Sequence, residues 1–280
     1  MTILDEGTSI TIPTWNNLVY LKLCIESLKK HSRLDHEILV HVSDGSDGSL
    51  DYVREQGLKY THSEENIGLC KGTNACAAMA SKPTVCYIND DMCVLPGWDT
   101  EMCAFMEANR IPELFWGCSM MIEPNTRPRG TPSFLVGRKY DFGRTADTYD
   151  EARLVAAVKS LQEEAPQAST QFWPPSLLPT YAWEEVGGLT EDYDDVCGGL
   201  ASDPDLALKM WNLGCRNFFS VPRSLTYHFG SRSTSRITNC RLARHLSRRL
   251  FAEKHGMSID HFTVNILHRG ELWDKERFNE

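Results

Sequence analysis

The sequence predicts an α/β fold, in which helices flank one mostly parallel sheet, and three observations support this. Short apolar runs alternate with segments of helical periodicity, as right-handed strand-helix-strand crossovers require. Two of the runs, 38–42 and 85–88, are almost continuously apolar, which is typical of strands buried on both faces. Both runs stop abruptly in acidic, amide or glycine residues. Because ligands bind beyond the carboxyl ends of parallel strands, we expect both clusters at one functional edge.

The composition is that of an ordinary globular protein. The chain has 280 residues, 41% hydrophobic and 24% charged, which suits one large domain or one domain with a subdomain. The net charge of −9 argues against general nucleic-acid binding. Since no basic leader precedes an apolar block and no apolar stretch could span a bilayer, we expect a cytoplasmic protein. The ten cysteines mostly lie in apolar segments without a CxxC pair, which favours reduced core thiols.

The first half of the chain alternates β-prone and helical segments. A strand at 9–13 is followed by turn residues at 14–17 and then by a helix at 18–28, whose apolar positions recur at helical spacing. After the strand at 38–42 come a short helix and a third strand. The glycine- and alanine-rich segment before the strand at 85–88 predicts a helix that lies close against the sheet. These three intervening elements are expected at 50–56, 58–61 and 70–80.

The second half is less regular. A helix at 97–109 and a strand at 114–120 precede a surface excursion at 123–143, which is rich in Pro, Arg and Gly. A helix at 147–165 leads to an aromatic, proline-containing loop at 166–179, for which packing is the first interpretation and contact with an acceptor the alternative. An acidic loop at 191–195 and a helix at 203–213 follow. The final expected strand is 218–222.

Local signals define the ends of the helix at 203–213. Asp203 is a good N-cap, Pro204 fits the first helical position and Gly214 fits the C-terminal cap. Capping alone would explain Asp203, just as a structural role alone would explain His228. The segment 236–251 predicts an amphipathic helix with arginines on one side. Docking on the protein surface is its first interpretation, and peripheral contact with the inner face of a membrane or with a phosphate-rich acceptor is the alternative.

The acids after the strand at 85–88 suggest a metal. Asp90 and Asp91 follow Asn89 directly, and adjacent carboxylates need a cation, a hydrogen-bond donor or water beside them. Their hard oxygens suit Mg²⁺ or Mn²⁺, which also bind phosphates. A solvated turn before Pro96 and Gly97 is the alternative. The sequence has neither GxGxxG nor GxxxxGK[ST] at the expected turns, so a metal would carry most of the phosphate charge of any bound nucleotide.

Taken together, the motifs resemble the family-2 glycosyltransferases with the GT-A fold. The resemblance runs from about Ile10 to Gly256 and is weakest between Glu123 and Thr180. Each motif is weak alone, whereas their order and spacing together are specific. The motifs are Ile12-Pro13-Thr14-Trp15-Asn16, Val42-Ser43-Asp44-Gly45-Ser46 with Asp47-Gly48, Asn66-Ile67-Gly68 with Gly72 and Asn74, Ile88-Asn89-Asp90-Asp91 with Pro96-Gly97-Trp98, Glu185-Val186-Gly187-Gly188, Ser202-Asp203-Pro204-Asp205-Leu206, and Tyr227-His228-Phe229-Gly230-Ser231.

The resemblance implies a GT-A-type, Rossmann-like domain at 1–230. Its nucleotide-sugar-binding half would be 1–122 and its acceptor-binding half 123–230, with a C-terminal amphipathic helix and tail at 231–280. It also implies a metal-dependent, inverting transfer of a sugar from a nucleotide-sugar donor to an acceptor hydroxyl. A UDP- or dTDP-sugar is favoured over a GDP-sugar, and the acceptor would be a glycan, a lipid-linked molecule or another hydroxyl compound.

By the same resemblance, individual residues receive roles. Asp44 would hydrogen-bond the nucleotide base, Asp91 and His228 would hold Mn²⁺ or Mg²⁺, and Asp203 would be the catalytic base, with its pKa lowered by helix amides. The full donor-binding set is Pro13, Thr14, Asn16, Asp44, Gly68, Lys71, Asn74, Asn89 and Asp90. The acceptor-binding set is Trp173, Trp183 and Glu184. Two departures are Ser202, where the family often has Glu, and Asn89, which replaces a common aspartate.

Two other classes remain as alternatives. A sugar-phosphate nucleotidyltransferase uses a related sheet and metal acids, but should open with a glycine- and arginine-rich loop, which the turn at 13–16 does not supply. A non-catalytic protein that binds nucleotide sugars or carbohydrates would keep the sheet without turnover. The oligomeric state is not indicated by the sequence.

Overall fold

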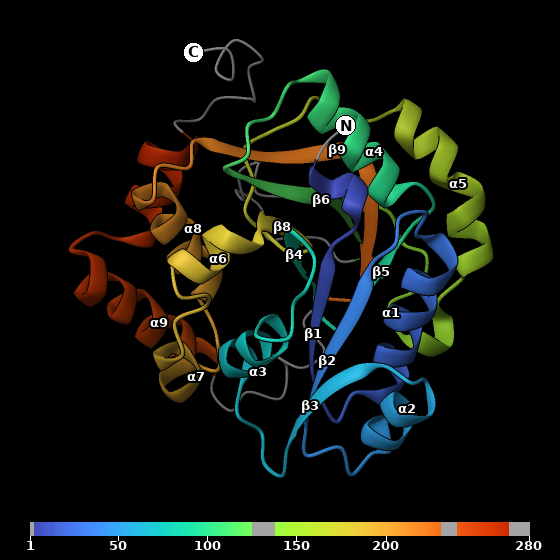
Figure 1. Ribbon diagram of the computed structural model, residues 1–280, viewed down its shortest axis with the longest axis horizontal. Coiled ribbons are helices and arrows are strands. Elements are labelled where there is room, and N and C mark those ends of the chain that lie inside the picture. The colour runs from blue at the N-terminus through green and yellow to red at the C-terminus, as the bar shows by residue number, and fades with distance from the viewer. Residues whose placement is uncertain (1–2, 125–137, 231–239, 269–280) are drawn as a thin grey trace.

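Figure 1 shows the computed structural model, which describes residues 3–124, 138–230 and 240–268. The strands are β1 (Ser9–Trp15), β2 (Glu37–Ser43), β3 (Lys59–Ser63), β4 (Thr84–Tyr87), β5 (Met92–Val94), β6 (Phe115–Glu123), β7 (Arg138–Lys139), β8 (Ser176–Pro179) and β9 (Asn217–His228). The helices are α1 (Leu18–His31), α2 (Ser49–Glu55), α3 (Leu69–Ala77), α4 (Trp98–Ala108), α5 (Glu151–Glu163), α6 (Thr180–Glu185), α7 (Asp192–Cys197), α8 (Ser202–Asn212) and α9 (Cys240–His255), with shorter 3-10 or π segments η1 (Ile3–Glu6), η3 (Ala146–Thr148) and η5 (His261–His268).

The strands form one mixed sheet, in the order β3-β2-β1-β4-β8-β6-β9-β5, with β7 beside β6. β1 pairs in parallel with β2 and β4, β2 with β3, and β6 with β9. β8 is antiparallel to both of its neighbours, and β5 is antiparallel to β9. The predicted fold class is therefore confirmed. The two antiparallel strands were not predicted, because elements of three or four residues carry too little periodicity.

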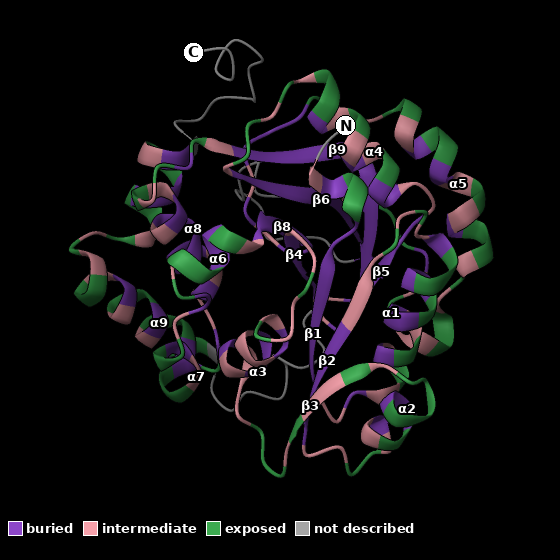
Figure 2. Ribbon diagram, viewed as in Figure 1, coloured by how far each residue is buried: buried purple, intermediate pink, exposed green. Residues whose placement is uncertain are grey.

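Helices cover both faces of the sheet (Figure 1). The central strands β4, β6 and β8 are buried throughout, whereas the edge strand β3 is partly exposed (Figure 2). One core cluster joins α1, α2 and α4 to β1 through residues such as Leu21, Met102 and Ile10. A second cluster joins α6, α8 and α9 to the opposite face through residues such as Leu206 and Phe251. Burial on both faces explains why the central strands are continuously apolar.

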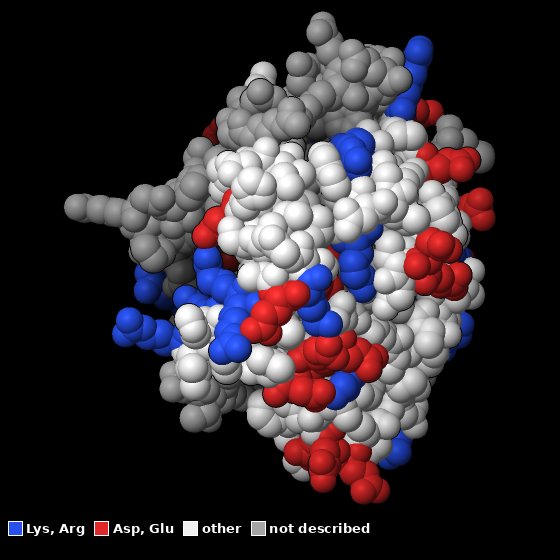
Figure 3. Space-filling view, turned by 90° about the vertical axis from the view of Figure 1, so that its left-hand side faces the viewer, with Lys and Arg blue, Asp and Glu red and all other residues white. Residues whose placement is uncertain are grey.

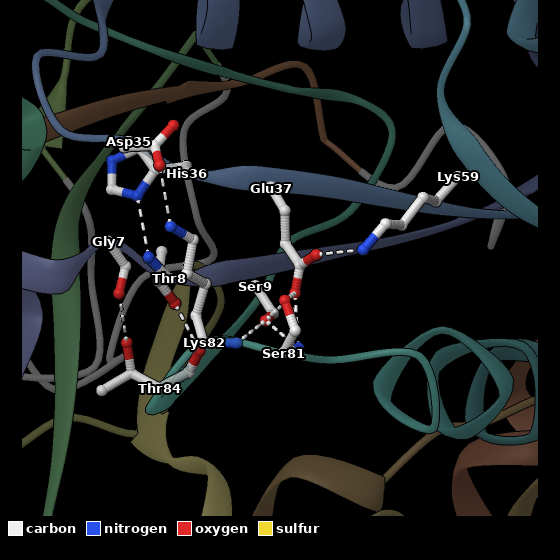
Figure 4. A network of polar contacts seen from close by, with 10 residues as sticks. All are labelled: Gly7, Thr8, Ser9, Asp35, His36, Glu37, Lys59, Ser81, Lys82 and Thr84. Atoms are coloured by element: carbon white, nitrogen blue, oxygen red, sulfur yellow. Dashed lines mark hydrogen bonds and ion pairs between the residues drawn. The ribbon is translucent and has the colours of Figure 1, made fainter.

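A polar network ties the strands together at the amino ends of β1 and β2 (Figure 4). Glu37 Oε1 accepts a hydrogen bond of 2.6 Å from Ser9 Oγ and one of 2.9 Å from Ser81 Oγ, while its Oε2 lies 2.8 Å from Lys59 Nζ. Nearby, Thr8 Oγ1 donates to the carbonyl oxygen of Thr84 at 2.9 Å. This network fixes the register of β1, β2, β3 and β4 at the edge opposite to the acidic strand ends.

Two predicted element boundaries are wrong. α8 begins at Ser202, and Ala201 occupies the N-cap with a φ of 68°, so Asp203 lies inside the first turn and is not the N-cap. The strand predicted at 218–222 continues to His228, because Pro222 falls in an irregularity of the β6–β9 ladder between Ser119 and Met120. A proline cannot donate to the ladder but is tolerated at such a bulge.

Other differences concern short or undescribed segments. The acidic stretch predicted as a loop at 191–195 forms most of α7, and α6 was not predicted. Within the described residues the C-terminal helix begins at Cys240, so the first residues of the segment predicted at 236–251 lie outside them. Positions 125–137 of the predicted surface excursion also lie outside them.

The prediction of reduced core thiols is confirmed for the described chain. Its cysteines are free at nine positions, and all of these except Cys103 are buried. Among the helices that can be described, none has the length and apolarity needed to cross a bilayer.

Candidate functional site

The acids after β4 form a buried turn that leads into β5. The side chains of Asp90 and Asp91 are 3% and 4% exposed. Asp90 Oδ2 accepts a hydrogen bond of 2.7 Å from Thr14 Oγ1 of β1, and the Asp91 carbonyl oxygen accepts one of 3.1 Å from the amide of Phe229. The side-chain oxygen of Asn89 is buried and has no hydrogen-bond partner within the described residues. The predicted delivery of acids to the carboxyl end of β4 is therefore what the structure shows.

His228, at the end of β9, lies between two carboxylates. Its Nε2 is 3.5 Å from Asp91 Oδ1, and its Nδ1 is 2.9 Å from Glu123 Oε1 at the end of β6. The other oxygen of Glu123 lies 2.6 Å from Lys139 Nζ. Burial alone would lower the pKa of His228, but the two adjacent carboxylates more than offset this and raise that pKa to about 9. The structure thus brings the two predicted metal ligands together.

A second pair of predicted residues meets at the carboxyl ends of β1 and β2. Asn16 Nδ2 donates to Asp44 Oδ2 at 2.6 Å, and Asn16 Oδ1 accepts from the Gly45 amide at 3.0 Å. Hydrogen bonds from Ser46 and Asn16 hold the pKa of Asp44 below its usual value. Asn16 and Asp44 both have positive φ, at 45° and 63°. This edge therefore presents an ionised carboxylate in a fixed orientation.

Asp203 is partly buried and is joined to the β4 strand by a short hydrogen bond. The hydroxyl of Tyr87, the last residue of β4, donates to Asp203 Oδ1 at 2.6 Å. Burial raises the pKa of Asp203 to about 6, although the Tyr87 hydrogen bond opposes the rise. The expectation that helix amides would lower this pKa is wrong, because in the described structure the carboxylate accepts from Tyr87 and not from the amides of α8.

Gly68 and Lys71 lie at the start of α3, where they contact α7. Asp194 caps α3 by accepting from the amides of Cys70 at 3.0 Å and Lys71 at 2.8 Å. Gly68 has a φ of 97°, and a Cβ there would lie 2.3 Å from the Asp194 Cγ. Lys71 Nζ pairs with Asp195 at 2.6 Å. These contacts give both residues a structural part, and their donor-binding role stays a prediction.

Asn74 and Pro13 also have defined packing partners. The Asn74 amide donates to the Leu189 carbonyl oxygen at 2.8 Å and accepts from the Leu189 amide at 2.9 Å. Pro13 is buried within β1, and its Cβ lies 3.3 Å from where a Cβ on Gly72 would be. Both residues thus attach α3 and its neighbouring loop to the sheet, and their contact with a donor stays a prediction.

The predicted acceptor residues differ in exposure. Trp183 is 5% exposed and belongs to the core cluster around α6 and α8, whereas Glu184 is exposed. Trp173 is partly buried and packs against Phe172, with ring centroids 4.5 Å apart and the ring planes tilted by 34°. Its indole nitrogen has no hydrogen-bond partner among the described residues. Their contact with an acceptor stays a prediction. Of the three side chains, Trp183 has the smallest exposed fraction available for such a contact.

The sequence reasoning missed Glu123 and Tyr87. Glu123 is the last residue of an apolar strand, and Asp44 directly follows one. An acid at the end of an apolar strand was therefore a signal that could have identified Glu123, but this residue was assigned to the surface excursion instead. Tyr87 lies in an apolar run, where an aromatic residue is indistinguishable from an ordinary core residue.

The side chains of Asp91 and His228 suit a divalent metal ion whose remaining ligands come from a bound substrate. In residues 3–124, 138–230 and 240–268, no three His, Cys, Asp or Glu side chains are grouped so as to hold a metal by themselves. Mg²⁺ and Mn²⁺, however, are commonly bound by one or two side chains together with substrate phosphates and water. The carboxylate of Asp91 fits that mode for both ions, and the imidazole nitrogen of His228 is a ligand that Mn²⁺ accepts more readily than Mg²⁺.

A sequence model described as Glycosyl transferase family 2 matches residues 9–160. No curated protein sequence matches significantly. Among solved structures, residues 1–349 of S. aureus TarS superpose with a TM-score of 0.61 at 15% identity, covering 91% of this chain and 72% of that chain. The same TarS region in complex with UDP-GlcNAc gives 0.59 at 15% identity, covering 94% and 72%. A structure of longer TarS gives 0.58 at 15% identity, and there the match spans 93% of this chain but 42% of that chain. At this identity the likeness shows the fold, which is the predicted GT-A fold.

Proposed function

The chain belongs to glycosyl transferase family 2, and from this premise we propose that it transfers a sugar from a UDP-sugar to an acceptor hydroxyl, with inversion and with a divalent metal ion. The observation that carries the proposal is that predicted site residues contact the end of β4 or its following turn: Asp91 lies 3.5 Å from His228, and Asp203 accepts a hydrogen bond from Tyr87, the last residue of β4. A UDP-sugar is favoured because the TarS fold neighbour was solved in complex with UDP-GlcNAc. The acceptor class is left open.

The donor would bind across the ends of β1, β2 and β4. Asp44, held by Asn16, is a fixed acceptor for the N3–H group of a uracil base. Asn89, whose side-chain oxygen has no partner within the described residues, and Asp90, fixed by Thr14, follow β4 where the ribose and diphosphate would lie. This placement follows the general position of ligands in parallel α/β sheets.

The metal would lie between Asp91, His228 and the diphosphate. When bound, a divalent ion supplies a Lewis acid that stabilises the negative charge of the departing nucleoside diphosphate. Asp91 contributes a negative ligand. His228, whose raised pKa keeps it protonated without metal, would release one proton on binding and contribute a neutral ligand, which leaves room for phosphate oxygens and water.

Asp203 would remove the proton from the acceptor hydroxyl. A general base is most effective when its pKa lies near the working pH, and burial raises the pKa of Asp203 to about 6. Its Oδ1 is engaged by Tyr87, so Oδ2 is the oxygen we assign to the acceptor proton. Attack by the activated hydroxyl on the face opposite to the diphosphate would invert the anomeric centre.

Variants of the full chain test these roles. UDP release from a panel of UDP-sugars with Mn²⁺ should fall by at least about 100-fold in both Asp91→Ala and Asp203→Asn. Mn²⁺-dependent UDP binding should be lost in Asp91→Ala and kept in Asp203→Asn. The matched controls are Asp260→Ala and Glu253→Gln. Each changes an exposed carboxylate that pairs with an arginine of α9, Arg248 or Arg249.

Each outcome assigns or removes a role. Full turnover in Asp203→Asn would remove it as the base, and undiminished UDP binding in Asp91→Ala would remove the metal site. Binding without turnover across the whole donor panel would favour a non-catalytic nucleotide-sugar-binding protein. Family membership and the absence of a glycine-rich triphosphate loop at 13–16 make a nucleotidyltransferase the weaker reading.

A further inference from the structure

The imidazole of His228 has a carboxylate on each side, and the two differ in distance. Glu123 Oε1 lies 2.9 Å from Nδ1, which is a normal hydrogen-bond length, whereas Asp91 Oδ1 lies 3.5 Å from Nε2. The Nδ1 side is therefore tightly held, and the Nε2 side faces Asp91 at a looser separation. The proposed function places a metal ion on that looser side.

Strand pairing fixes Glu123 in this position. β6 is paired with β9 through Ile122 and Tyr227, so the next residues along, Glu123 and His228, are adjacent. On its other side β6 pairs with β7, with Glu123 opposite Lys139. If either strand slipped by one residue, its own side chain at this position would turn to the other face of the sheet and the pair would be lost.

The carboxylate of Glu123 has different partners for its two oxygens. Oε1 meets the imidazole and Oε2 lies 2.6 Å from Lys139 Nζ. The side chain of Glu123 is 12% exposed and that of His228 is 11% exposed, so water screens these contacts little. The ammonium group favours the ionised carboxylate and limits its rotation, which leaves one oxygen directed at Nδ1.

We propose that Glu123 is a positioning residue that holds His228 with its proton on Nδ1 and the lone pair of Nε2 directed at the metal site beside Asp91. This inference rests on the proposed function. A carboxylate that accepts from the distal nitrogen of a ligating histidine fixes its tautomer and ring orientation, and loss of such a partner typically weakens metal binding by about 10- to 100-fold.

Metal affinity is the first readout. Free Mn²⁺ is measured by electron paramagnetic resonance during titration of the full chain with UDP present. We expect Glu123→Ala to weaken Mn²⁺ binding by about 10- to 100-fold, and Glu123→Gln to recover most of the loss, because the amide oxygen still accepts from Nδ1–H. Glu101→Ala is the matched control, because it removes a partly buried ion pair with Arg223 away from His228. It should bind Mn²⁺ like the unmodified chain.

Comparison with ligand variants separates the inference from its premise. If His228→Ala weakens binding and Glu123→Ala does not, Glu123 is only structural and the inference is overturned. If neither Asp91→Ala nor His228→Ala weakens binding, the metal site itself is wrong, and the inference falls with it.

The histidine tautomer gives a readout that needs no variant of Glu123. Nitrogen NMR of histidine-labelled protein with Mg²⁺ and UDP should show His228 protonated at Nδ1 and unprotonated at Nε2. Its signal is assigned with His228→Gln. The reverse tautomer would overturn the inference, even if Glu123→Ala proved unable to fold.

Discussion

At the scale of single residues, the reactivity of Asp203 depends on two opposing effects. Burial disfavours its charged form, whereas the hydroxyl of Tyr87 stabilises that form through a hydrogen bond of 2.6 Å. The balance raises the pKa of Asp203 to about 6, so the carboxylate is mostly ionised at neutral pH and yet is more basic than an exposed aspartate. A strand-terminal tyrosine thus adjusts a group that lies 116 positions further along the chain.

Tyr87→Phe should change this balance in one direction. Without the hydroxyl, no hydrogen bond from Tyr87 stabilises the ionised form of Asp203 against burial, so its pKa should rise. The acid limb of the pH profile of kcat/KM should then move from near pH 6 to higher pH, by on the order of one unit. The pH dependence of UDP-sugar turnover measures this. Tyr52→Phe, a change on α2 at a side chain 9% exposed, is the control and should leave the limb in place. An unmoved limb in Tyr87→Phe would contradict the assignment of this limb to Asp203.

Site residues were predictable where residue type and position carried a signal together. Asp44 and Asp91 are acids that follow apolar strands, and such residues lie at the ligand-binding edge of a parallel sheet. The role of Tyr87 was not predictable, because its hydroxyl contacts Asp203 only through the tertiary fold. The pKa of Asp203 was predicted in the wrong direction, since the helix starts two residues earlier than its capping signals indicate.

At the scale of elements, α3 and α7 are joined through one close approach. Asp194 of α7 accepts from two amides at the start of α3, and this brings its carboxyl group against Gly68. A side chain at position 68 would meet both an unfavourable φ of 97° and the atoms of Asp194. Glycine is therefore required here for space as well as for conformation.

Gly68→Ala should reduce the free energy of unfolding by about 2 to 4 kcal/mol, from backbone strain plus overpacking. Gly57→Ala is a matched control, because its φ of 64° is also positive but no atom lies within 4 Å of the added Cβ. That change should cost only about 1 kcal/mol. Urea unfolding of both variants gives the comparison, and equal losses would show that the contact with Asp194 is not limiting.

The elements themselves were predictable in proportion to their length. α1, α4 and α5 have several helical turns of periodic apolar residues, and each was expected close to its observed range. α6 and α7 have six residues each, which is too short for periodicity to distinguish them from loops. The extension of β9 beyond Pro222 depends on a bulge against β6, a tertiary feature with no local signal.

At the scale of the whole molecule, the amino edge of the sheet is stabilised by a polar network, whereas the carboxyl edge holds the candidate site. The polar network of Figure 4 binds strand ends to one another at the amino edge, where Glu37 contacts Ser9, Lys59 and Ser81. The carboxyl edge holds the acids of the candidate site. Because the network at the amino edge fixes the strand register, the carboxyl edge can hold several acidic side chains close together without the strands shifting.

Glu37 should make the stability of the molecule depend on acid pH. Burial alone would raise the pKa of Glu37, but hydrogen bonds from Lys59, Ser9 and Ser81 outweigh it and lower that pKa to about 2. A lowered carboxylate pKa stabilises the fold above the unfolded value near 4.5, and this stabilisation is lost as the pH falls towards 2. Glu37→Gln should therefore cost about 2 kcal/mol at pH 7 and much less at pH 3, as measured by urea unfolding. A pH-independent difference would contradict this account.

The C-terminal helix α9 is part of the same folded unit. On its inner side Phe251 is fully buried, and His255 Nε2 lies 2.7 Å from the buried carboxylate of Asp205 in α8. Its outer side carries the exposed residues Arg241, Arg244, Arg248 and Arg249. Acidic and basic side chains lie close together on this face of the molecule (Figure 3), and Lys254 pairs with Asp192 of α7 at 2.6 Å. This arrangement favours the interpretation of a helix docked on the protein over one whose apolar face enters a membrane.

Substitution of apolar residues on the two sides of α9 distinguishes these interpretations. Phe251→Ala should lower the free energy of unfolding by about 3 to 5 kcal/mol, because it opens a cavity in the core cluster around α8. Leu242→Ala changes a side chain that is 49% exposed and should cost less than about 1 kcal/mol. If α9 instead served as a membrane contact, Phe251→Ala would leave unfolding in water almost unchanged and would weaken sedimentation with anionic lipid vesicles. Urea unfolding and vesicle sedimentation of both variants therefore decide whether the inner face of α9 belongs to the protein core.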